Sequence, residues 1–334
     1  MSRWCALPGL SATGYQANAL HSESCMWVEK NCYADVWVEL LHSLQLEPAA
    51  LMPFTLAVDF EGDHWTFFKP PLADLRSLYG IDVQELNVWR PLADHAAEHL
   101  AHGRLIATEA NAFWLPDTAG TDYRQQHVKT TIVLNDLDLA NQRLGYFHNA
   151  GYFSLEGEDF RQTFRLDGCG DASALPLYAE LIRIDRLLRR PEPELAKISA
   201  RLLRSHFEWR PAHNPLPRFA ERFNADLPQL HARGLAHYHA WAFTTLRQLG
   251  AAFELLSHHL RWLAPHDDAR LANAAERFDV IAQDSKSLIL KVARVVNAQR
   301  AFDAAVAFAP MAQAWDDGMG LLAQALQQPA PGER

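Results

Sequence analysis

Hydrophobic residues recur at three- and four-residue steps after Asn31, and this spacing predicts a helix. The apolar positions on its one face are Val36, Leu40, Leu41 and Leu44. Asn31 is a favoured N-cap residue, and Glu47-Pro48 ends the pattern. Cys32 is therefore placed in the first turn, where unpaired backbone N–H groups and the helix dipole favour a thiolate over a thiol.

A second pattern, apolar and β-branched, predicts two antiparallel strands further along the chain. The polar loop 116–123 and His127 precede a strand-like run over 128–134. A turn at 135–138 follows, and the run 143–153 then reads as the antiparallel partner, with Asn149 near its end.

The pattern changes near residue 170. Short alternating runs such as 65–68 and 105–108 precede the glycine-rich segment 167–170, and helical spacing dominates after it. The predicted C-terminal helices cover 175–190, 194–207, 235–263, 269–300 and 310–326. The prediction is an α+β chain, with a mixed domain over 1–170 and a helical bundle over 171–330.

Composition fits a soluble intracellular enzyme. The chain has 334 residues, of which 49% are hydrophobic, so it can bury one large core or two ordinary ones. No apolar run is long enough to span a membrane, and the N-terminus lacks a signal-peptide pattern, which predicts a cytoplasmic protein. Its four cysteines are scattered, as expected for reduced thiols; Cys25 is a rival nucleophile to Cys32.

Charge is divided unevenly. Residues 1–170 hold 11 Lys and Arg against 22 Asp and Glu, a balance of −11, whereas residues 171–334 hold 20 against 18, a balance of +2. Four arginines share the predicted helix 175–190: Arg183, Arg186, Arg189 and Arg190. They form either a docking surface for an acidic carrier protein or a solvated helix face. The acidic chain contains no nucleic-acid-binding motif, which argues against a nucleic-acid partner.

Cys32, His127 and Asn149 have the side chains that a cysteine enzyme needs. A thiolate attacks an acyl carbon, an imidazole moves protons, and a side-chain carbonyl orients the imidazole. Asn31 and Tyr33, on either side of Cys32, are candidates for oxyanion or substrate contacts. The alternative is that Cys32 is a small core residue of its helix.

The sequence favours neither a metal site nor a bound cofactor. The paired histidines at 237 and 239 and at 258 and 259 point to different sides of a helix rather than converging on one ion. The chain has no phosphate-binding glycine loop and no dinucleotide fingerprint.

Four segments together resemble the bacterial family called domain of unknown function 1839, and the likeness covers nearly the whole chain. They are residues 31–42, 54–63, 115–121 and 146–152, of which 54–63 reads as a hairpin. That family is distantly similar to the butirosin biosynthesis protein H group, whose members move an aminoacyl group from a carrier-protein thioester to an amine. The resemblance implies a papain-like N-terminal domain in which Cys32 is the nucleophile, His127 the base and Asn149 its orienting residue.

The expected function is therefore acyl transfer. Cys32 takes an acyl or aminoacyl group from a phosphopantetheine thioester on a carrier protein, and a small amine accepts it with His127 as the base. Two alternatives remain. One is a hydrolase, either an amidase, a peptidase or a thioesterase, in which water replaces the amine. The other is a binding module for a carrier protein without catalysis.

Overall fold

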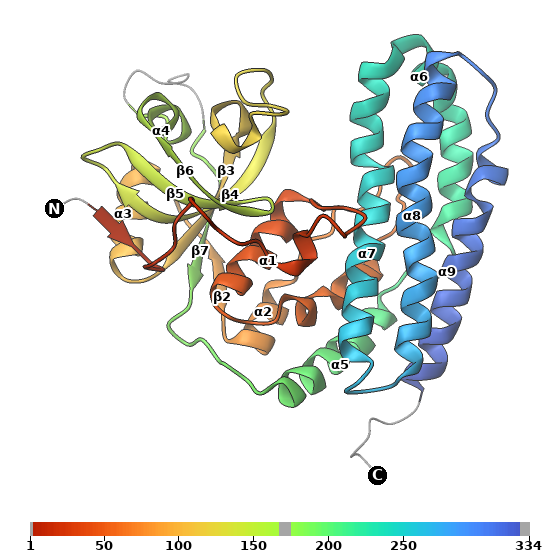
Figure 1. Ribbon diagram of the computed structural model, residues 1–334, viewed down its shortest axis with the longest axis horizontal. Coiled ribbons are helices and arrows are strands. Elements are labelled where there is room, and N and C mark those ends of the chain that lie inside the picture. The colour runs from red at the N-terminus through yellow and green to blue at the C-terminus, as the bar shows by residue number, and fades with distance from the viewer. Residues whose placement is uncertain (1–2, 167–174, 328–334) are drawn as a thin grey trace. The chain divides into compact units, whose positions relative to one another are not determined.

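The computed structural model describes residues 3–166 and 175–327 of the chain (Figure 1). They belong to two compact units. The first is formed by Met1–His21, Asn31–Leu46 and Leu75–Arg189, and the second by Ser22–Lys30, Glu47–Asp74 and Arg190–Arg334. The chain thus passes into the second unit before Cys32 and returns at Asn31. The predicted boundary at residue 170 lies outside the described residues, and the contact pattern divides the later chain at 189/190.

The first unit is an antiparallel sheet with helices, and together with the helical second unit it confirms the α+β prediction. Its strands are β1 (Arg3–Cys5), β2 (Asp82–Glu85), β3 (Leu105–Asn111), β4 (Lys129–Asp138), β5 (Arg143–His148), β6 (Gly151–Glu156) and β7 (Ala179–Arg183). The order is β2-β7-β3-β4-β5-β6, with β1 paired to β4, and every neighbouring pair is antiparallel. β4 and β5 form the antiparallel pair that the sequence predicts.

The two faces of this sheet carry different partners because strand side chains alternate. On one face, Ile106, Ile132 and Tyr146 join the core that includes helix α3 (Leu92–Ala101). The other face packs against α1 (Cys32–Ser43), the helix predicted from the spacing after Asn31. Helices α2 (Leu72–Tyr79) and α4 (Gly157–Thr163) and the 3-10 turns η1 (Ala19–His21), η2 (Pro48–Ala57), η3 (Ala112–Trp114) and η4 (Pro116–Thr118) complete the elements before β7.

The C-terminal part of the second unit, from Arg190 onward, is helical. Its helices are α5 (Glu192–Glu208), α6 (Pro215–Thr244), α7 (Leu246–Leu263), α8 (Arg270–Asn297) and α9 (Ala304–Leu326). Segment 22–30 packs onto α7 in this unit. A Cβ at Gly250 would lie 2.7 Å from the Trp27 indole nitrogen, so this glycine leaves the room that the buried Trp27 ring needs. Among the described residues, the structure contains no helix with the length and apolarity to cross a membrane.

Several predictions of secondary structure were wrong. The predicted turn at 135–138 is the end of β4, and the single strand predicted over 143–153 is β5, a turn at 149–150 and the start of β6. The expected helix over 175–190 is instead strand β7 and a following loop, because residues 179–183 pair with β2 on one side and with β3 on the other. The single helix over 235–263 is two helices, since Thr245 has non-helical φ and ψ angles. The expected hairpin at 54–63 is instead the end of η2 up to Ala57 and a loop, in which only Phe60 makes a bridge, with Trp65.

Buried charges fix α1 in the first unit. Both ring nitrogens of His21 face carboxylates: Nε2 lies 3.0 Å from Asp35 Oδ1, and Nδ1 contacts Glu39. All three side chains are fully buried. Two ionised carboxylates are both satisfied here only when both ring nitrogens donate, as they do in an imidazolium. Burial opposes ionisation of Glu39, but the bonds from His21 and Tyr15 outweigh it and hold the Glu39 pKa below its ordinary value.

This network predicts acid sensitivity. A carboxyl with a lowered pKa in the folded state adds stability at neutral pH, and that contribution is lost as the pH falls through the lowered pKa. Glu39→Gln should therefore reduce the free energy of unfolding at pH 7 by about 3–5 kcal/mol, as for a broken buried ion pair. Urea unfolding at pH 7 and pH 4 measures this, and the wild-type advantage should shrink at the lower pH. Glu98→Gln, in an exposed pair with Arg90, is the control and should change little. An equal loss at both pH values would contradict the assignment.

Candidate functional site

Cys32 is the first residue of α1, and the helix start around it is well ordered by hydrogen bonds. The Asn31 side chain accepts from the backbone N–H groups of Tyr33 and Ala34, at 3.1 and 2.8 Å. The Asp35 N–H is bonded to the Asn31 carbonyl. The Cys32 N–H itself has no acceptor within the described part of the chain. A half-buried thiol is thus joined to a backbone donor that can bind an oxyanion.

The residues on either side of Cys32 are engaged in holding the helix. Asn31 is buried, and its side-chain oxygen caps the helix. The buried Tyr33 hydroxyl donates to Glu180 of β7 at 2.6 Å, and burial is the main cause that raises the Tyr33 pKa. The substrate or oxyanion contacts predicted for these two side chains therefore compete with structural bonds.

The thiol contacts a hydroxyl rather than an imidazole. Cys32 Sγ lies 3.9 Å from Thr131 Oγ1 on β4. Over residues 3–166 and 175–327, no hydrogen bond joins Cys32 to a histidine, and none joins His127 to Asn149. The structure does not bring the three predicted catalytic residues into mutual contact.

His127 is exposed and is oriented by Asn111 rather than by Asn149. Its Nδ1 lies 2.8 Å from the Asn111 side-chain nitrogen, and its ring stacks on Phe113 with centroids 4.4 Å apart. The Asn111 oxygen caps η3 by accepting from the Phe113 N–H, which leaves the amide nitrogen to donate to His127. In the neutral ring Nδ1 is then the acceptor and Nε2 carries the proton. This arrangement suits His127 to donate a hydrogen bond to a ligand.

Asn149 and His148 occupy the end of β5. Asn149 lies in the turn between β5 and β6 with φ 43°, a left-handed conformation that asparagine tolerates better than most residues. His148 is 1% exposed; its Nε2 lies 2.7 Å from Thr130 Oγ1, and its Nδ1 lies 2.5 Å from Asp117 Oδ2. Thr130 and Thr131 point to opposite faces of β4, so His148 is on the other side of the sheet from Cys32.

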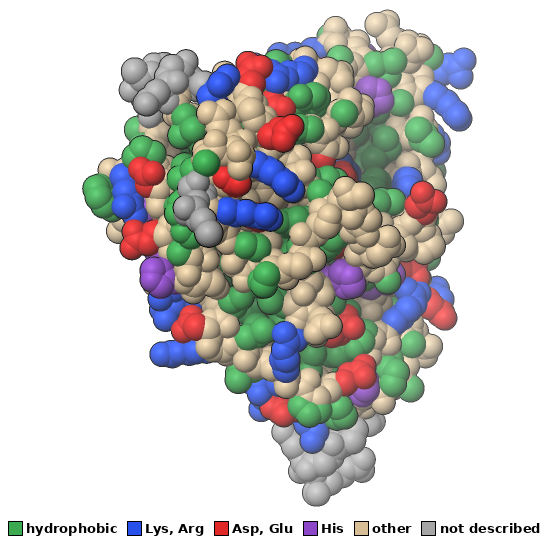
Figure 2. Space-filling view, turned by 60° about the vertical axis from the view of Figure 1, so that its left-hand side comes forward, with side chains coloured by type: hydrophobic (Ala, Val, Ile, Leu, Met, Phe, Trp, Pro, Cys, Tyr) green, Lys and Arg blue, Asp and Glu red, His purple; other side chains and the backbone are tan. Residues whose placement is uncertain are grey.

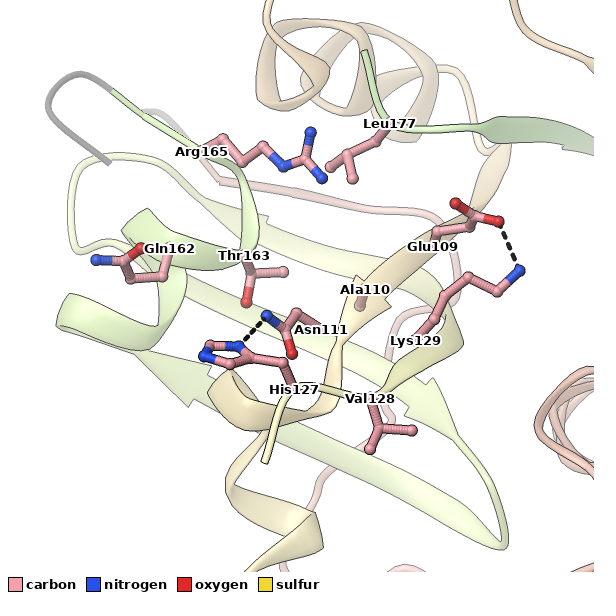
Figure 3. Close-up of a pocket in the computed structure, with 10 residues that line it drawn as sticks. All are labelled: Glu109, Ala110, Asn111, His127, Val128, Lys129, Gln162, Thr163, Arg165 and Leu177. Carbon is pink, nitrogen blue, oxygen red and sulfur yellow. Dashed lines mark hydrogen bonds and ion pairs between the residues drawn. The ribbon is translucent and has the colours of Figure 1, made fainter. Parts of the chain in front are cut away.

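A pocket of about 250 Å³ opens at the end of β3 and β4, beside His127 (Figure 3). Its lining residues are Glu109, Ala110, Asn111, His127, Val128, Lys129, Gln162, Thr163, Arg165 and Leu177. Lys129 forms an ion pair with Glu109 at 2.8 Å. Thr163 is 7% exposed, and its hydroxyl, which Figure 3 shows directed toward Asn111 and His127, has no hydrogen-bond partner among the described residues. A buried hydroxyl without a partner is a place where a polar ligand atom would be stabilised.

Register connects this pocket to the thiol. Thr131, which contacts Cys32, is paired across the sheet with Glu109, and Asn111 is paired with Lys129. Cross-strand partners lie on the same face of a sheet. Glu109 and Lys129 of the pocket therefore lie on the sheet face that meets Cys32, whereas Ala110 lies on the opposite face, in the core that includes α3.

The rival cysteine lies in the second unit. Cys25 Sγ is 3.9 Å from His258 Nε2 of α7. This Cys–His contact was not anticipated, because Cys25 and His258 are far apart along the chain and no pattern links them.

The four arginines predicted to share one helix lie on β7 and in the loop after it, and three of them bond to other groups of the chain. Arg183 ends β7 and is paired with Asp82 and Asp185. Arg189 donates to the Leu44 carbonyl, and Arg190 is paired with Glu194. Figure 2 likewise shows Lys and Arg side chains interspersed with Asp and Glu on the face that it presents. The basic docking face expected from the sequence depended on a helix that is absent from the described residues 175–190.

Three polar residues of this region were missed from the sequence. Asn111 ends β3 and could have been found as an N-cap of the next turn. Thr131 could have been found from alternation within its strand, once Cys32 was placed against it. Thr163 carries no local signal, since only the fold shows that its hydroxyl is buried.

Comparison with known families covers most of the chain. The profile of the DUF1839 N-terminal domain matches residues 16–184, and the profile of the DUF1839 C-terminal domain matches residues 192–324. A search of curated proteins finds no match. Since the first profile alone covers half of the chain and the second covers most of the remainder, the chain belongs to the DUF1839 family.

Proposed function

We propose that this protein is a cysteine acyltransferase with a papain-like catalytic unit, in which Cys32 carries the acyl group. The observation that supports this most directly is the start of α1. A half-buried thiol sits at the first position of a capped helix, and the N–H of the same residue has no acceptor in the described structure. Papain-like enzymes use a cysteine at the start of a central helix in the same way.

The reaction has two steps, and neither needs a nucleotide. In the first, the Cys32 sulfur attacks the carbonyl carbon of a thioester, the carbon–sulfur bond to the donor breaks, and the thiol proton passes to the donor sulfur. In the second, an amine attacks the acyl-enzyme and releases the Cys32 sulfur, and one amine proton passes to this sulfur or to water. The Cys32 N–H stabilises the oxyanion in both steps.

The pocket supplies substrate contacts to this proposal. His127 Nε2–H, the Thr163 hydroxyl and the Arg165 guanidinium present donors there, which suits carbonyl, carboxylate or phosphate oxygens. A phosphopantetheine arm has such oxygens along its length. The proposed donor is accordingly an acyl or aminoacyl group on a carrier protein in the cytoplasm, and the acceptor is a small amine. The proposal gives Asn149 no part in orienting His127, because it lies in the turn between β5 and β6 and makes no bond to His127 among the described residues.

The assignment of His127 changes in one respect. With Nδ1 held by the Asn111 amide, His127 cannot take a proton at Nε2 unless the ring first changes tautomer. The proposal therefore gives His127 the role of a donor that positions the substrate, rather than that of the base.

A carrier-binding module without catalysis is the second candidate. The contact of Cys32 with the Thr131 hydroxyl, and not with a histidine, is the observation that favours it. Hydrolysis would use the same nucleophile with water as the acceptor, and it is separated from transfer by the product that forms.

The nucleophile can be tested by acylation. Incubation with an aminoacyl-loaded carrier protein should add one aminoacyl mass to the wild-type protein and none to Cys32→Ala, because no other residue is proposed to carry the group. Intact-mass spectrometry measures this, and adding an amine should convert the adduct to an amide. Cys25→Ser is the matched control and should be acylated like the wild type.

Three results would count against this reading. An adduct retained in Cys32→Ala would refute the nucleophile. Binding of the carrier without any adduct would support the module. Release of the free acid in the presence of amine would identify a hydrolase.

The role of His127 can be separated from that of a base. If it donates a hydrogen bond, His127→Gln keeps an N–H near the position of Nε2 and should lose less than about tenfold in kcat/KM, with most of the loss in KM. His127→Ala should lose more. A base would instead make both variants slower by about two to four orders of magnitude in kcat. Steady-state kinetics with varied donor concentration distinguish the two outcomes.

A further inference from the structure

A cluster of three potential metal ligands lies in the second unit, apart from Cys32 and its pocket. Glu254 and His258 are four residues apart on α7, so their side chains share one face of that helix. Cys25 comes from segment 22–30, which packs on α7 in the same unit. One ligand atom from each of the three residues lies within 4.8 Å of the other two.

We propose that Cys25, Glu254 and His258 form a binding site for a zinc-like divalent cation. The distance between the sulfur and the imidazole nitrogen suits one ion. Zinc binds sulfur at about 2.3 Å and imidazole nitrogen at about 2.0 Å, so two such ligands of one ion lie at most about 4.3 Å apart. Cys25 Sγ and His258 Nε2 are 3.9 Å apart. Three protein ligands leave the fourth tetrahedral position for water or another small ligand.

The chemistry of the three ligands selects the class of metal. A thiolate and an imidazole favour zinc and similar transition ions, whereas calcium and magnesium prefer oxygen ligands alone. Burial lowers the pKa of His258 to about 4, so the imidazole is neutral near pH 7 and needs no deprotonation before it binds. Binding by Cys25 releases the thiol proton to solvent as the metal–sulfur bond forms.

Glu254 already has partners, and they are compatible with a metal. Its two oxygens accept from the backbone N–H groups of Met26 and Trp27, and Lys30 lies 3.9 Å away. Each carboxylate oxygen has two lone pairs, so an oxygen that accepts one N–H can still bind an ion. Burial raises the Glu254 pKa despite these partners, and a bound cation would stabilise the ionised form.

The charge of the site is nearly balanced when the ion is bound. The two charges of the cation are matched by the Cys25 thiolate and the Glu254 carboxylate, so the ion and its three protein ligands together carry no net charge. The ion would tie segment 22–30 to α7. This segment directly precedes Asn31, so a bound ion would hold the residues that come immediately before α1 in the chain.

Cobalt(II) substitution tests the site with a readout that does not depend on acylation. Titration of the full-length protein with Co²⁺ should give a thiolate-to-cobalt charge-transfer band and the visible bands of a four-coordinate ion, saturating at one equivalent. Cys25→Ser should abolish the charge-transfer band, and His258→Gln should weaken binding by about a hundredfold or more. Cys5→Ser and Cys32→Ser are the matched controls and should keep the band.

Residue-resolved alkylation keeps the test decisive if a variant fails to fold. In the wild-type protein, Zn²⁺ should slow iodoacetamide labelling of Cys25 and leave Cys5 and Cys32 unchanged. A featureless Co²⁺ spectrum together with equal Cys25 labelling with and without Zn²⁺ would overturn the proposal. A band that is lost in Cys32→Ser but kept in Cys25→Ser would place the metal elsewhere and overturn it equally.

Discussion

The position of Cys32 depends on how α1 is held on the sheet, and buried charge holds it. The His21 ring lies between the carboxylates of Asp35 and Glu39 of α1, and the Tyr33 hydroxyl is bonded to Glu180 of β7. Such groups are costly to bury unless all of them are paired. Since each has its partner in one geometry only, they favour a single placement of the helix. The thiol and the first-turn N–H groups are thereby fixed against β4.

Two of the segments that carry the family resemblance meet on the opposite side of the sheet. Asp117, from the loop before β4, accepts from the Tyr146 hydroxyl and from His148, and His148 in turn contacts Thr130. These buried bonds hold the loop against β4 and β5. In this chain these two segments therefore support the sheet, whereas the segment that begins at Asn31 combines support with the candidate chemistry.

Local patterns were sufficient for some elements and insufficient for others. Helical spacing and the Asn31 cap predicted α1 and its first residue, and alternation predicted the β4–β5 pair. The segment 175–190 was misread as a helix because its leucines and arginines have high helix propensity, but pairing with β2 and β3 decides its conformation. Propensity is a local quantity, and strand pairing between residues about 75 to 100 positions apart is not.

The candidate site shows the same division. Cys32 could be found because a cysteine at a helix start has a local signature. Three other features could not be found from the sequence, because each arises from segments that meet only in the folded chain. They are the Asn111–His127 bond, the Thr163 hydroxyl without a partner among the described residues, and the cluster of Cys25, Glu254 and His258. Asn149 was chosen as the residue that orients His127 because of the order of the strands along the chain. The strand register, which the sequence does not show, instead places Asn149 in a turn and Asn111 beside His127.

The central claim is that the start of α1 makes Cys32 the reactive thiol of this chain, and its alkylation rate tests that claim most directly. The wild-type protein is treated with iodoacetamide near pH 7, and labelling of Cys5, Cys25 and Cys32 is followed by peptide mass spectrometry. Burial raises the pKa of the Cys5 thiol, so Cys5 should react slowly. The account predicts that Cys32 reacts fastest of the three and that Asn31→Ala, which removes the cap, slows it. A Cys32 that reacts no faster than Cys5, in protein shown to be folded, would contradict the account.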